Sequence, residues 1–464
     1  MTSVPRPFTH HRGEQQRAAD ARRAEAAARQ LAGRASSIAT TFVDHSGAAR
    51  VKVVPVTGLP AAARSGLGFS PVIDAFTSDG GIDPQSPLDK PDGDLRLVPD
   101  LDGLTVLAEP AGWAFVPGDR FHQDGTAYAG CQRSFARAQV AAALSKGISA
   151  LMAFEVEWMV GRDTEDFAPA FGGTGYGLSR LIGAADYIRD VLAALEAAAV
   201  RVEQIHPEYG PAQFEVSVAA QDPVSAADTC VLVKYLIAAV SARHGLRATF
   251  APAVVSDNVG NGGHLHASFW QDGRNLLSGG SGRHGLTQTG ESIVAGLLDA
   301  LPALLAIGAP SPASYLRLQP SRWAGVFQIW GTENREAAVR FIAASPADPG
   351  TANVELKCFD LSANPYLLTG AVLSIAIASA DRQTRLPDEV SGDPGVPGHP
   401  LADRAVRLPG SLAEAVAALE ASDDLRKAAG EELLSTFAAS RRAEIGLAEG
   451  QPTDVIIARA RWLS

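Results

Sequence analysis

Two glutamates, Glu155 and Glu157, stand two positions apart in the segment ALMAFEVEWMVG, whose apolar and aromatic residues predict a strand. Since alternate side chains of a strand share a face, both carboxylates lie on one side, and Phe154, Val156 and Trp158 face a core. Neighbouring carboxylates repel unless a cation separates them. The motif alone fits either a solvated strand face or part of a cation site.

Two further segments carry polar side chains of the same kind. HPEYGPAQFEVSV places Glu208 on a turn and Glu215 on a strand, which also fits an ordinary hairpin with exposed acids. In GNGGHLHASFW, His264, His266 and Ser268 alternate along a predicted strand. The glycines before them allow backbone to approach a ligand closely. This second arrangement favours a site over a structural role.

The last segment, NVELKCFD, places Glu355 and Lys357 on one strand face and is weak by itself. Combined with the others it completes an oxygen-rich set that suits two hard divalent cations, Mg²⁺ or Mn²⁺. The proposed ligands are Glu155, Glu157, Glu208, Glu215, His264 and Glu355. Arg317, Arg335 and Arg340 supply the positive charge that a phosphoryl group needs. The set indicates phosphoryl transfer rather than hydrolysis alone.

These residues need a sheet to position them, and the pattern predicts an α+β protein. Strands are expected at 213–220, 262–270, 337–344 and 353–360, with helices at 132–146, 184–200 and 225–245 and a helical tail after Leu408. A large, mostly antiparallel, curved sheet with flanking helices is the expected core of this second domain.

The first part of the chain has a different pattern, with one helix and several short strands. A helix is expected at 14–33, followed by short strands at 38–43, 50–56, 95–101 and 104–110 and a loop at 77–94. We therefore divide the chain into an N-terminal helical extension (1–36), a small sheet domain (37–127) and a catalytic domain (128–464).

Composition limits the location and partners. The net charge of −11 argues against a nucleic-acid binder. The cysteines, Cys131, Cys230 and Cys358, form no CxxC pair, which favours a reducing cytoplasm. The N-terminus lacks the apolar core of a secretory signal. The apolar run 366–380 is shorter than the roughly 20 residues that span a bilayer, so we expect a buried helix and no membrane partner.

The motifs FEVE, HPEYGPAQFE, GNGGHLHAS, RLQP…NREAAVR and ELKCFDLSANPYL occur in this order. In these motifs the chain resembles the glutamine synthetase family, and the resemblance extends from about residue 37 to about residue 444. The resemblance implies a β-grasp-like N-terminal domain, a catalytic α+β domain and homo-oligomeric rings, dodecameric in most bacterial members, with each site between neighbouring subunits. It also implies that ATP activates the γ-carboxylate of glutamate and that an amine displaces the phosphate.

The resemblance assigns roles to individual residues. One metal would be held by Glu157, Glu208 and Glu215, and the other by Glu155, His264 and Glu355, with two or three Mg²⁺ or Mn²⁺ ions in all. The glutamate substrate would contact Gly260, Arg317, Glu157 and Lys357. ATP would contact His266, Ser268, Arg335 and Arg340. The two arginines and the base Glu208 would be the catalytic residues.

Two departures concern the amine. Ammonia-using members carry an acid in the loop after the Arg-Leu-x-Pro motif, where this chain has Trp323, and a second acid after an N-terminal Phe, where it has Ser70. A tryptophan offers an apolar wall whose face attracts cations. In both changes the chain resembles the ligases that join glutamate to ethanolamine, polyamines or other amines. Asp74, or residues near Asp79, could supply the negative patch that a polyamine would need.

Other departures and other functions stay open at this point. Lys357 stands where arginine is usual, which keeps the charge and loses the bidentate fork. No tyrosine follows Tyr366, so control by adenylylation of a late tyrosine is not expected. The alternatives are a true glutamine synthetase that keeps Glu208 as base, and a catalytically silent scaffold or sensor. Trp323 could also simply pack its loop shut.

Overall fold

The N-terminal part of the chain forms a six-stranded sheet. The computed structural model describes residues 8–463. The strand order is β2-β1-β6-β4-β3, with β5 paired to β6, and β1 and β6 run parallel. The elements are α1 (Glu14–Leu31), β1 (Ala35–Val43), β2 (Ala49–Pro55), α2 (Leu59–Ser65), β3 (Leu67–Phe69), β4 (Leu95–Pro99), β5 (Thr105–Val106) and β6 (Gly112–His122). Helix α1 packs its Ala24 and Leu31 on the β1 residue Ile38, so this helix is part of the sheet's own core.

Strand β6 lies at the centre of this sheet, and the sequence analysis missed it. Its segment GWAFVPGDRFH contains Pro117 and Gly118, which usually mark a strand end. Gly118 is needed for packing, since a Cβ there would lie 2.5 Å from Cδ1 of Leu97 on β4. The strand expected at 104–110 shrinks to Thr105–Val106.

The second sheet is large and carries the candidate site. It has nine strands in the order β13-β14-β15-β11-β7-β9-β8, with β10 paired to β7 and β12 to β11. Its pairings are antiparallel apart from β13 with β14. The strands are β7 (Ile148–Arg162), β8 (Val202–Pro207), β9 (Gln213–Val218), β10 (Leu246–Thr249), β11 (Leu265–Gln271), β12 (Arg274–Asn275), β13 (Phe327–Thr332), β14 (Ala337–Ile342) and β15 (Asn353–Leu356). Strands β8, β10, β12 and β13 were not predicted.

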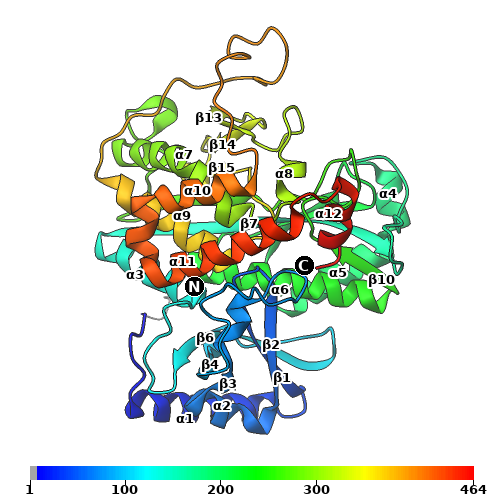
Figure 1. Ribbon diagram of the computed structural model, residues 1–464, viewed down its shortest axis with the longest axis vertical. Coiled ribbons are helices and arrows are strands. Elements are labelled where there is room, and N and C mark those ends of the chain that lie inside the picture. Colours follow the sequence, from blue (N-terminus) through cyan, green and yellow to red (C-terminus); the bar gives the residue numbers. More distant parts are fainter. Residues whose placement is uncertain (1–7, 464) are drawn as a thin grey trace.

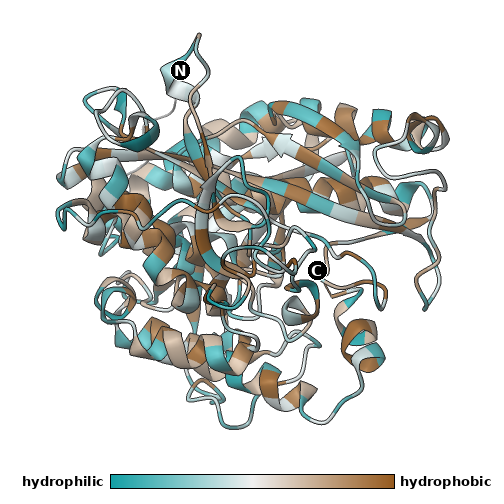
Figure 2. Cartoon of the chain, turned by 90° about the horizontal axis from the view of Figure 1, so that it is seen from above, coloured by the Kyte–Doolittle hydropathy of each residue, from teal (hydrophilic) through white to brown (hydrophobic). Residues whose placement is uncertain are grey.

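Helices cover the nine-stranded sheet (Figure 1). They are α3 (Gln132–Ser145), α4 (Leu178–Gly183), α5 (Ala185–Ala197), α6 (Pro223–Arg243), α7 (Gln288–Gly308), α8 (Ser314–Arg317), α9 (Pro365–Ala380), α10 (Leu412–Ala421), α11 (Asp423–Ala448) and α12 (Thr453–Ala460). Helix α9 is the buried helix that the sequence predicted. Outer helices show both teal and brown segments in Figure 2, as amphipathic helices do.

Two helices, α6 and α7, are long and apolar enough to cross a membrane by length and composition. Most of each helix is instead buried in the protein, with 61% of the apolar window of α6 and 78% of that of α7 inside the fold. Both belong to the main hydrophobic core.

One buried arginine joins the two sheets. Arg133 on α3 donates hydrogen bonds to Asp100 after β4 (2.8 Å), Asp119 on β6 (2.9 Å) and Asp228 on α6 (2.7 Å). The side chain of Arg133 is only 4% exposed. The hydroxyl of Tyr366 on α9 donates to Asp228 as well. A single guanidinium thus neutralises carboxylates from both parts of the fold.

We expect Arg133→Ala to lower the free energy of unfolding by about 3–5 kcal/mol, because it removes the arginine that pairs with Asp228 and leaves Arg137 as the remaining arginine beside Asp100 and Asp119. Thermal and urea unfolding of the purified protein measures the change. The matched control is Arg189→Ala, which removes a solvent-exposed arginine paired with Asp186 and should leave the transition where it is. Equal effects of the two changes would contradict the role of Arg133.

Candidate active site

Charged side chains form a row across one face of the nine-stranded sheet. Direct register partners on adjacent strands are Arg340 with Glu355, His266 with Glu355, Glu157 with Glu215, and His206 with Glu215. Paired residues of an antiparallel ladder point to the same side. From one end of the row to the other the residues are Arg340, Glu355, His266, Glu155, Glu157, Glu215 and His206. The strand order thus gathers motifs that lie far apart in the sequence.

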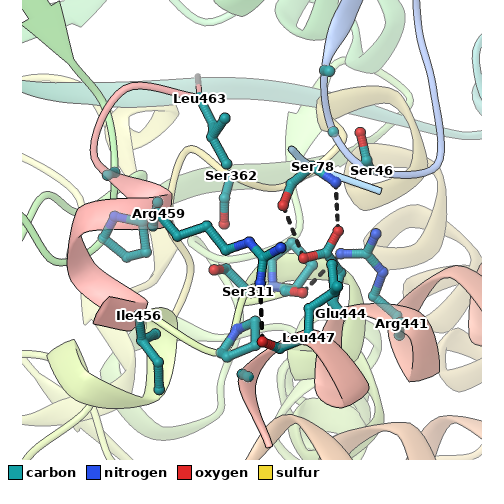
Figure 3. A pocket seen from close by; sticks show the side chains of 18 of the residues that line it. Ser46, Ser78, Ser311, Ser362, Arg441, Glu444, Leu447, Ile456, Arg459 and Leu463 are labelled. Atoms are coloured by element: carbon teal, nitrogen blue, oxygen red, sulfur yellow. Dashed lines mark hydrogen bonds between the residues drawn. The ribbon is translucent and has the colours of Figure 1, made fainter. Parts of the chain in front are cut away.

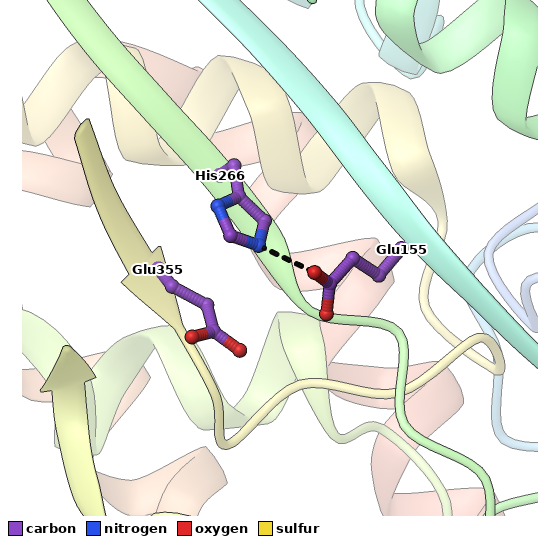
Figure 4. A group of neighbouring side chains, drawn as sticks. All are labelled: Glu155, His266 and Glu355. Atoms are coloured by element: carbon purple, nitrogen blue, oxygen red, sulfur yellow. Dashed lines mark ion pairs between the residues drawn. The ribbon is translucent and has the colours of Figure 1, made fainter. Parts of the chain in front are cut away.

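The first group of ligands lies where β7, β11 and β15 meet. Nδ1 of His264 is 2.9 Å from Glu155 and 3.1 Å from Glu355, so this imidazole joins the two carboxylates. Nε2 of His266 is 3.0 Å from Glu155. Figure 4 shows Glu155, His266 and Glu355 converging, and ligand atoms of these three lie within 4.8 Å of one another. The predicted set of Glu155, His264 and Glu355 is brought together, with His266 beside it.

A second group lies around the end of β8 and the start of β9. Ligand atoms of His206, Glu208 and Glu215 lie within 4.8 Å of one another. Nδ1 of His206 is 3.6 Å from Glu208, and its Nε2 is 3.4 Å from Glu215. Glu208 also accepts hydrogen bonds from the hydroxyl of Tyr176 (2.6 Å) and from the backbone N–H of Tyr209 (2.9 Å).

Glu157 lies between the groups and is fixed by a neighbouring amide and by backbone. One of its oxygens accepts hydrogen bonds from Nε2 of Gln213 (2.9 Å) and from the backbone N–H of Gly262 (2.8 Å). A Cβ on Gly262 would lie 2.5 Å from Nε2 of His264 and 2.7 Å from Glu157. Gln213 also donates to the carbonyl of Gly260 at 3.0 Å. The glycines expected to approach a ligand therefore first make room for the site's own side chains.

Burial and charge shift the pKa values of both groups. Burial raises the pKa of Glu215, and burial together with the nearby Glu157 raises that of Glu208. Burial alone would raise the pKa of Glu155 too, but hydrogen bonds to His264 and His266 hold it below its usual value. The hydrogen bond to Glu215 raises the pKa of His206 to about 9. Imidazolium groups thus supply the positive charge that these carboxylates need.

Divalent cations fit this donor set. It offers carboxylate oxygens and imidazole nitrogens, which are ligands of Mg²⁺ and Mn²⁺, from strands that the sheet holds rigid. Buried carboxylates at this spacing are costly unless positive charge compensates them. The residues present therefore fit metal ions as well as they fit the protonated imidazoles.

Cationic side chains border the row at the β14–β15 end. Lys357 donates to Glu355 at 3.1 Å, and Arg340 donates to Glu355 at 2.9 Å and to Glu333. Arg317, at the end of α8, approaches Nε2 of His264 at 3.1 Å and donates to the carbonyl of Lys357 at 3.2 Å. Its Nη1 is buried and has no hydrogen-bond partner among residues 8–463. A free guanidinium N–H beside the acidic row fits the carboxylate of a substrate.

Not every predicted residue joins the row. Arg335 is exposed and forms no ion pair within the described part of the chain. Ser268 is buried further along β11 and accepts a hydrogen bond from the indole of Trp270. Ser70 follows β3 in the lower part of Figure 1, whereas α8 and β13, which bracket Trp323, lie in the upper part. One chain by itself therefore does not bring Ser70 to Trp323.

Asp74 and Asp79 are each paired with an arginine, so Asp74 does not supply the free negative charge that was considered from the sequence. Asp74 is 1% exposed and forms an ion pair with the buried Arg120 at 2.6 Å. Asp79 pairs with Arg459 on α12. Both carboxylates are neutralised by cations of their own chain.

Sequence reasoning also missed several residues of the site. His206 stands two positions before Glu208 on a strand, and this alternation could have identified it. Gln213 lies inside a quoted motif. Tyr176 lies in a glycine-rich loop, and Arg180 holds the carbonyls of Gly173 (2.9 Å) and Gly210 (2.6 Å). The contacts of Tyr176 and Arg180 depend on how this loop folds back onto the site. The spacing of residues in the sequence does not indicate that.

A separate cavity lies away from this row (Figure 3). It is bounded by the turn after β1, the loop at Ser78 and helices α11 and α12. Within it, Glu444 accepts hydrogen bonds from the backbone N–H and hydroxyl of Ser78. The described residues that line it include none of those predicted for the active site.

The fold and the acidic row define a known class of protein. The model of the glutamine synthetase catalytic domain matches residues 129–460, and the chain belongs to this family.

Individual relatives narrow the comparison. The chain is 48% identical to the gamma-glutamylpolyamine synthetase GlnA3 of Streptomyces coelicolor over 96% of its length and 97% of the relative's. It is 32% identical to a glutamine synthetase of Pyrococcus horikoshii over 72% of the chain and 71% of that protein. Among solved structures, a novel glutamine synthase homolog matches with a TM-score of 0.83 and 30% identity, covering 93% of this chain and 99% of the other. A GmaS–ADP complex matches with a TM-score of 0.81 and 27% identity, over 92% and 96% of the two chains.

We expect Glu215→Ala to weaken Mn²⁺ binding by roughly 10- to 100-fold, because it removes one oxygen ligand from the group at β8 and β9. Titration calorimetry with Mn²⁺ measures the affinity. The control is Glu203→Ala, which removes an exposed carboxylate of β8 that pairs with Arg201. Unchanged Mn²⁺ binding by the Glu215 variant would remove this residue from the metal site.

Proposed function

We propose that this protein is an ATP-dependent ligase that joins the γ-carboxylate of glutamate to a primary amine of a polyamine through γ-glutamyl phosphate, releasing ADP and phosphate. The single observation that carries the proposal is the acidic row with the unpartnered Nη1 of Arg317 beside it. The polyamine is inferred from the relative named a gamma-glutamylpolyamine synthetase.

Glutamate is proposed to lie between Arg317 and Glu157. Nη1 of Arg317 donates to a substrate carboxylate, since this N–H is buried and has no partner in residues 8–463. The carbonyl of Gly260 accepts a hydrogen bond from the substrate's α-amino group. That carbonyl is held in place by Nε2 of Gln213 at 3.0 Å. Lys357 places a further positive charge next to Glu355.

The metals are proposed to be Mg²⁺ or Mn²⁺, two or three in number. One is held by Glu157, Glu208 and Glu215, and the other by Glu155, His264 and Glu355. When bound, such ions neutralise phosphate oxygens and orient the transferred group. The number of ions is a proposal from the family and is tested by the stoichiometry of Mn²⁺ titration.

The chain's own residues then act on ATP and on the acyl phosphate. His266 and Ser268 line the nucleotide site, and the amide oxygen of Asn353, 2.8 Å from Nδ1 of His266, fixes that imidazole. Arg340 and Arg335 stabilise charge on the moving phosphoryl group. Arg340 is already aligned by Glu355, whereas Arg335 is exposed and must turn inward. Glu208 accepts the proton of the attacking amine.

The amine site is proposed to lie under Trp323 and to be completed by a neighbouring subunit. The side chains of Tyr176, Leu178, Ile182 and Tyr209, near Glu208, are 56–70% exposed. A second copy of the N-terminal sheet, covering this apolar surface, would bring its Ser70 to the site. We accordingly propose homo-oligomeric rings, with a dodecamer as the expected form, in the cytoplasm.

The domain division is likewise a proposal. Residues 37–127 are taken as a β-grasp-like domain and 128–464 as the catalytic domain, with 1–36 as a helical extension. The six-stranded sheet is separate from the nine-stranded sheet, which supports a boundary between the N-terminal and catalytic domains. Ala24 and Leu31 of α1 belong to the same buried cluster as Ile38 of β1, so the extension is packed onto the N-terminal domain.

One alternative retains a supporting observation. A true glutamine synthetase would use ammonium, and Glu208, held by Tyr176, is available as the base. The exposed indole of Trp323, where ammonia-using members carry an acid, weighs against it. A silent scaffold has less support, because it has no need to keep a row of compensated acids.

The proposed function predicts phosphate release from ATP, glutamate and Mg²⁺ that depends on a polyamine. A panel of spermine, spermidine, putrescine, ethanolamine and ammonium measures it. We expect a polyamine to give the highest kcat/KM and ammonium the lowest. A maximum with ammonium would establish the alternative, and no release with any amine would support a silent protein.

Replacement of Trp323 tests the amine site directly. We expect Trp323→Glu to raise the kcat/KM ratio of ammonium over spermine by roughly 10- to 100-fold, because a carboxylate binds a small cation more strongly than the face of an indole does. Trp323→Phe is the matched control and should keep the polyamine preference. An unchanged profile in the glutamate variant would remove Trp323 from the amine site.

A further inference from the structure

A buried glutamate, Glu336, lies directly beneath the backbone of Trp323. It stands just before β14, and only 5% of the residue is exposed. One oxygen, Oε1, accepts a hydrogen bond from the backbone N–H of Trp323 at 2.7 Å. The other, Oε2, is buried and finds no hydrogen-bond partner in the part of the chain that is described. The loop that carries Trp323 is thus held by a carboxylate that has a hydrogen-bond donor at only one of its two oxygens within the described residues.

No cation among residues 8–463 forms an ion pair with this carboxylate. Lys357 is near enough to lower the pKa of Glu336, but its ammonium group donates to Glu355 at 3.1 Å. Burial is the larger effect and raises the pKa of Glu336. A buried carboxylate oxygen without a donor is costly, and an unsatisfied group of this kind calls for a partner from outside the chain. That partner must be a hydrogen-bond donor and is best a cation.

The loop above Glu336 has a strained backbone. Ser321, Trp323 and Gly325 all have positive φ, at 58°, 56° and 68°. Left-handed conformations at Ser and Trp cost energy that the surrounding contacts must supply. Two hydrogen bonds hold the exposed part of the loop: Oε1 of Glu336 accepts from the backbone N–H of Trp323, and the hydroxyl of Ser321 donates to Asp393 at 2.6 Å. The residues that follow, Ala324 and Val326, are buried in the main core and anchor the end of the loop.

A second carboxylate makes the surroundings of the indole negative. Asp393 lies in the coil between α9 and α10, which rises above β13 in Figure 1. It accepts hydrogen bonds from Ser321 and from the backbone N–H of Gly395, and its charge also raises the pKa of Glu336. Trp323 is 59% exposed, and the segment that carries it is held by these two acids, at its own backbone N–H and at Ser321. An exposed aromatic side chain together with nearby carboxylates can recognise alkylammonium groups.

We propose that Glu336 is the carboxylate that binds the ammonium group of the acceptor amine, with Trp323 as the cover over it. The amine enters as the loop lifts, takes the free Oε2 as hydrogen-bond acceptor, and packs its methylene chain on the indole. Glu336 thereby takes the place of the acid that ammonia-using members carry at position 323. The assignment rests on the proposed amine-ligase function and names the residue that selects a cationic amine.

The test compares a charged acceptor with an uncharged one. Glu336→Gln keeps an oxygen that can accept the N–H of Trp323 and loses only the negative charge. With spermine we expect KM for the amine to rise roughly 10- to 100-fold. With hydroxylamine, which is uncharged at pH 7 and captures γ-glutamyl phosphate as a hydroxamate, we expect kcat and KM to change less than about twofold. Glu336→Asp keeps the charge and should recover part of the spermine affinity.

Each outcome is decisive. If Glu336→Gln impaired the kinetics equally with spermine and with hydroxylamine, Glu336 would only stabilise the loop, and the assignment would be overturned. The same holds if the Gln and Asp variants lost spermine affinity equally. Unchanged kinetics of Glu336→Gln with spermine would overturn it as well. A wild-type protein that forms the hydroxamate but no γ-glutamylpolyamine would instead overturn the polyamine function, and the assignment with it. Thermal unfolding of both variants confirms that they are folded.

Discussion

Electrostatic repulsion between buried carboxylates is the constraint on which this structure depends. Glu155, Glu157, Glu215 and Glu355 point from one face of the nine-stranded sheet, where desolvation and mutual repulsion oppose their charged forms. The sheet order β14-β15-β11-β7-β9-β8 places a compensating group beside each acid: Arg340, Lys357, the three imidazoles, and the amide of Gln213. Divalent ions would compete with these groups for the same carboxylate oxygens, and we propose that metal, phosphate and glutamate bind at this row.

The sequence predicted the parts of this site that depend on strand alternation. The FEVE segment formed a strand with its acids on one face, and His264 and His266 reached the same region because β11 pairs with both β7 and β15. The predictions that failed concerned features that depend on tertiary folding. Strand β6 was not predicted because it contains Pro117 and Gly118, which usually mark the end of a strand. The neighbouring strands of the sheet accommodate both residues. Asp74 looked like a surface acid, yet Arg120 from another strand buries it. Tyr176 reaches Glu208 through a loop without periodicity.

The region around Trp323 gives a physical reason for a change of amine. Ammonium is small and needs charge close at hand, whereas a polyamine carries charge at intervals along an apolar chain. The loop presents an indole at the surface and holds two carboxylates, Glu336 and Asp393, at its base and side. We propose that Glu336, buried beneath the loop, supplies the negative charge that the loop lacks at Trp323, and that the indole contacts the methylene groups of the amine. The similarity to a gamma-glutamylpolyamine synthetase over nearly the whole chain agrees with this arrangement.

The central claim is that glutamate is activated by phosphorylation and then captured by a polyamine in one active site. Glutamate labelled with oxygen-18 at both γ-carboxylate oxygens, incubated with ATP, Mg²⁺ and spermine, tests it most directly. The account predicts that one labelled oxygen appears in each phosphate released, that the other stays in the amide, and that the product has the mass of γ-glutamylspermine. Unlabelled phosphate, or labelled phosphate without a spermine adduct, would contradict the account.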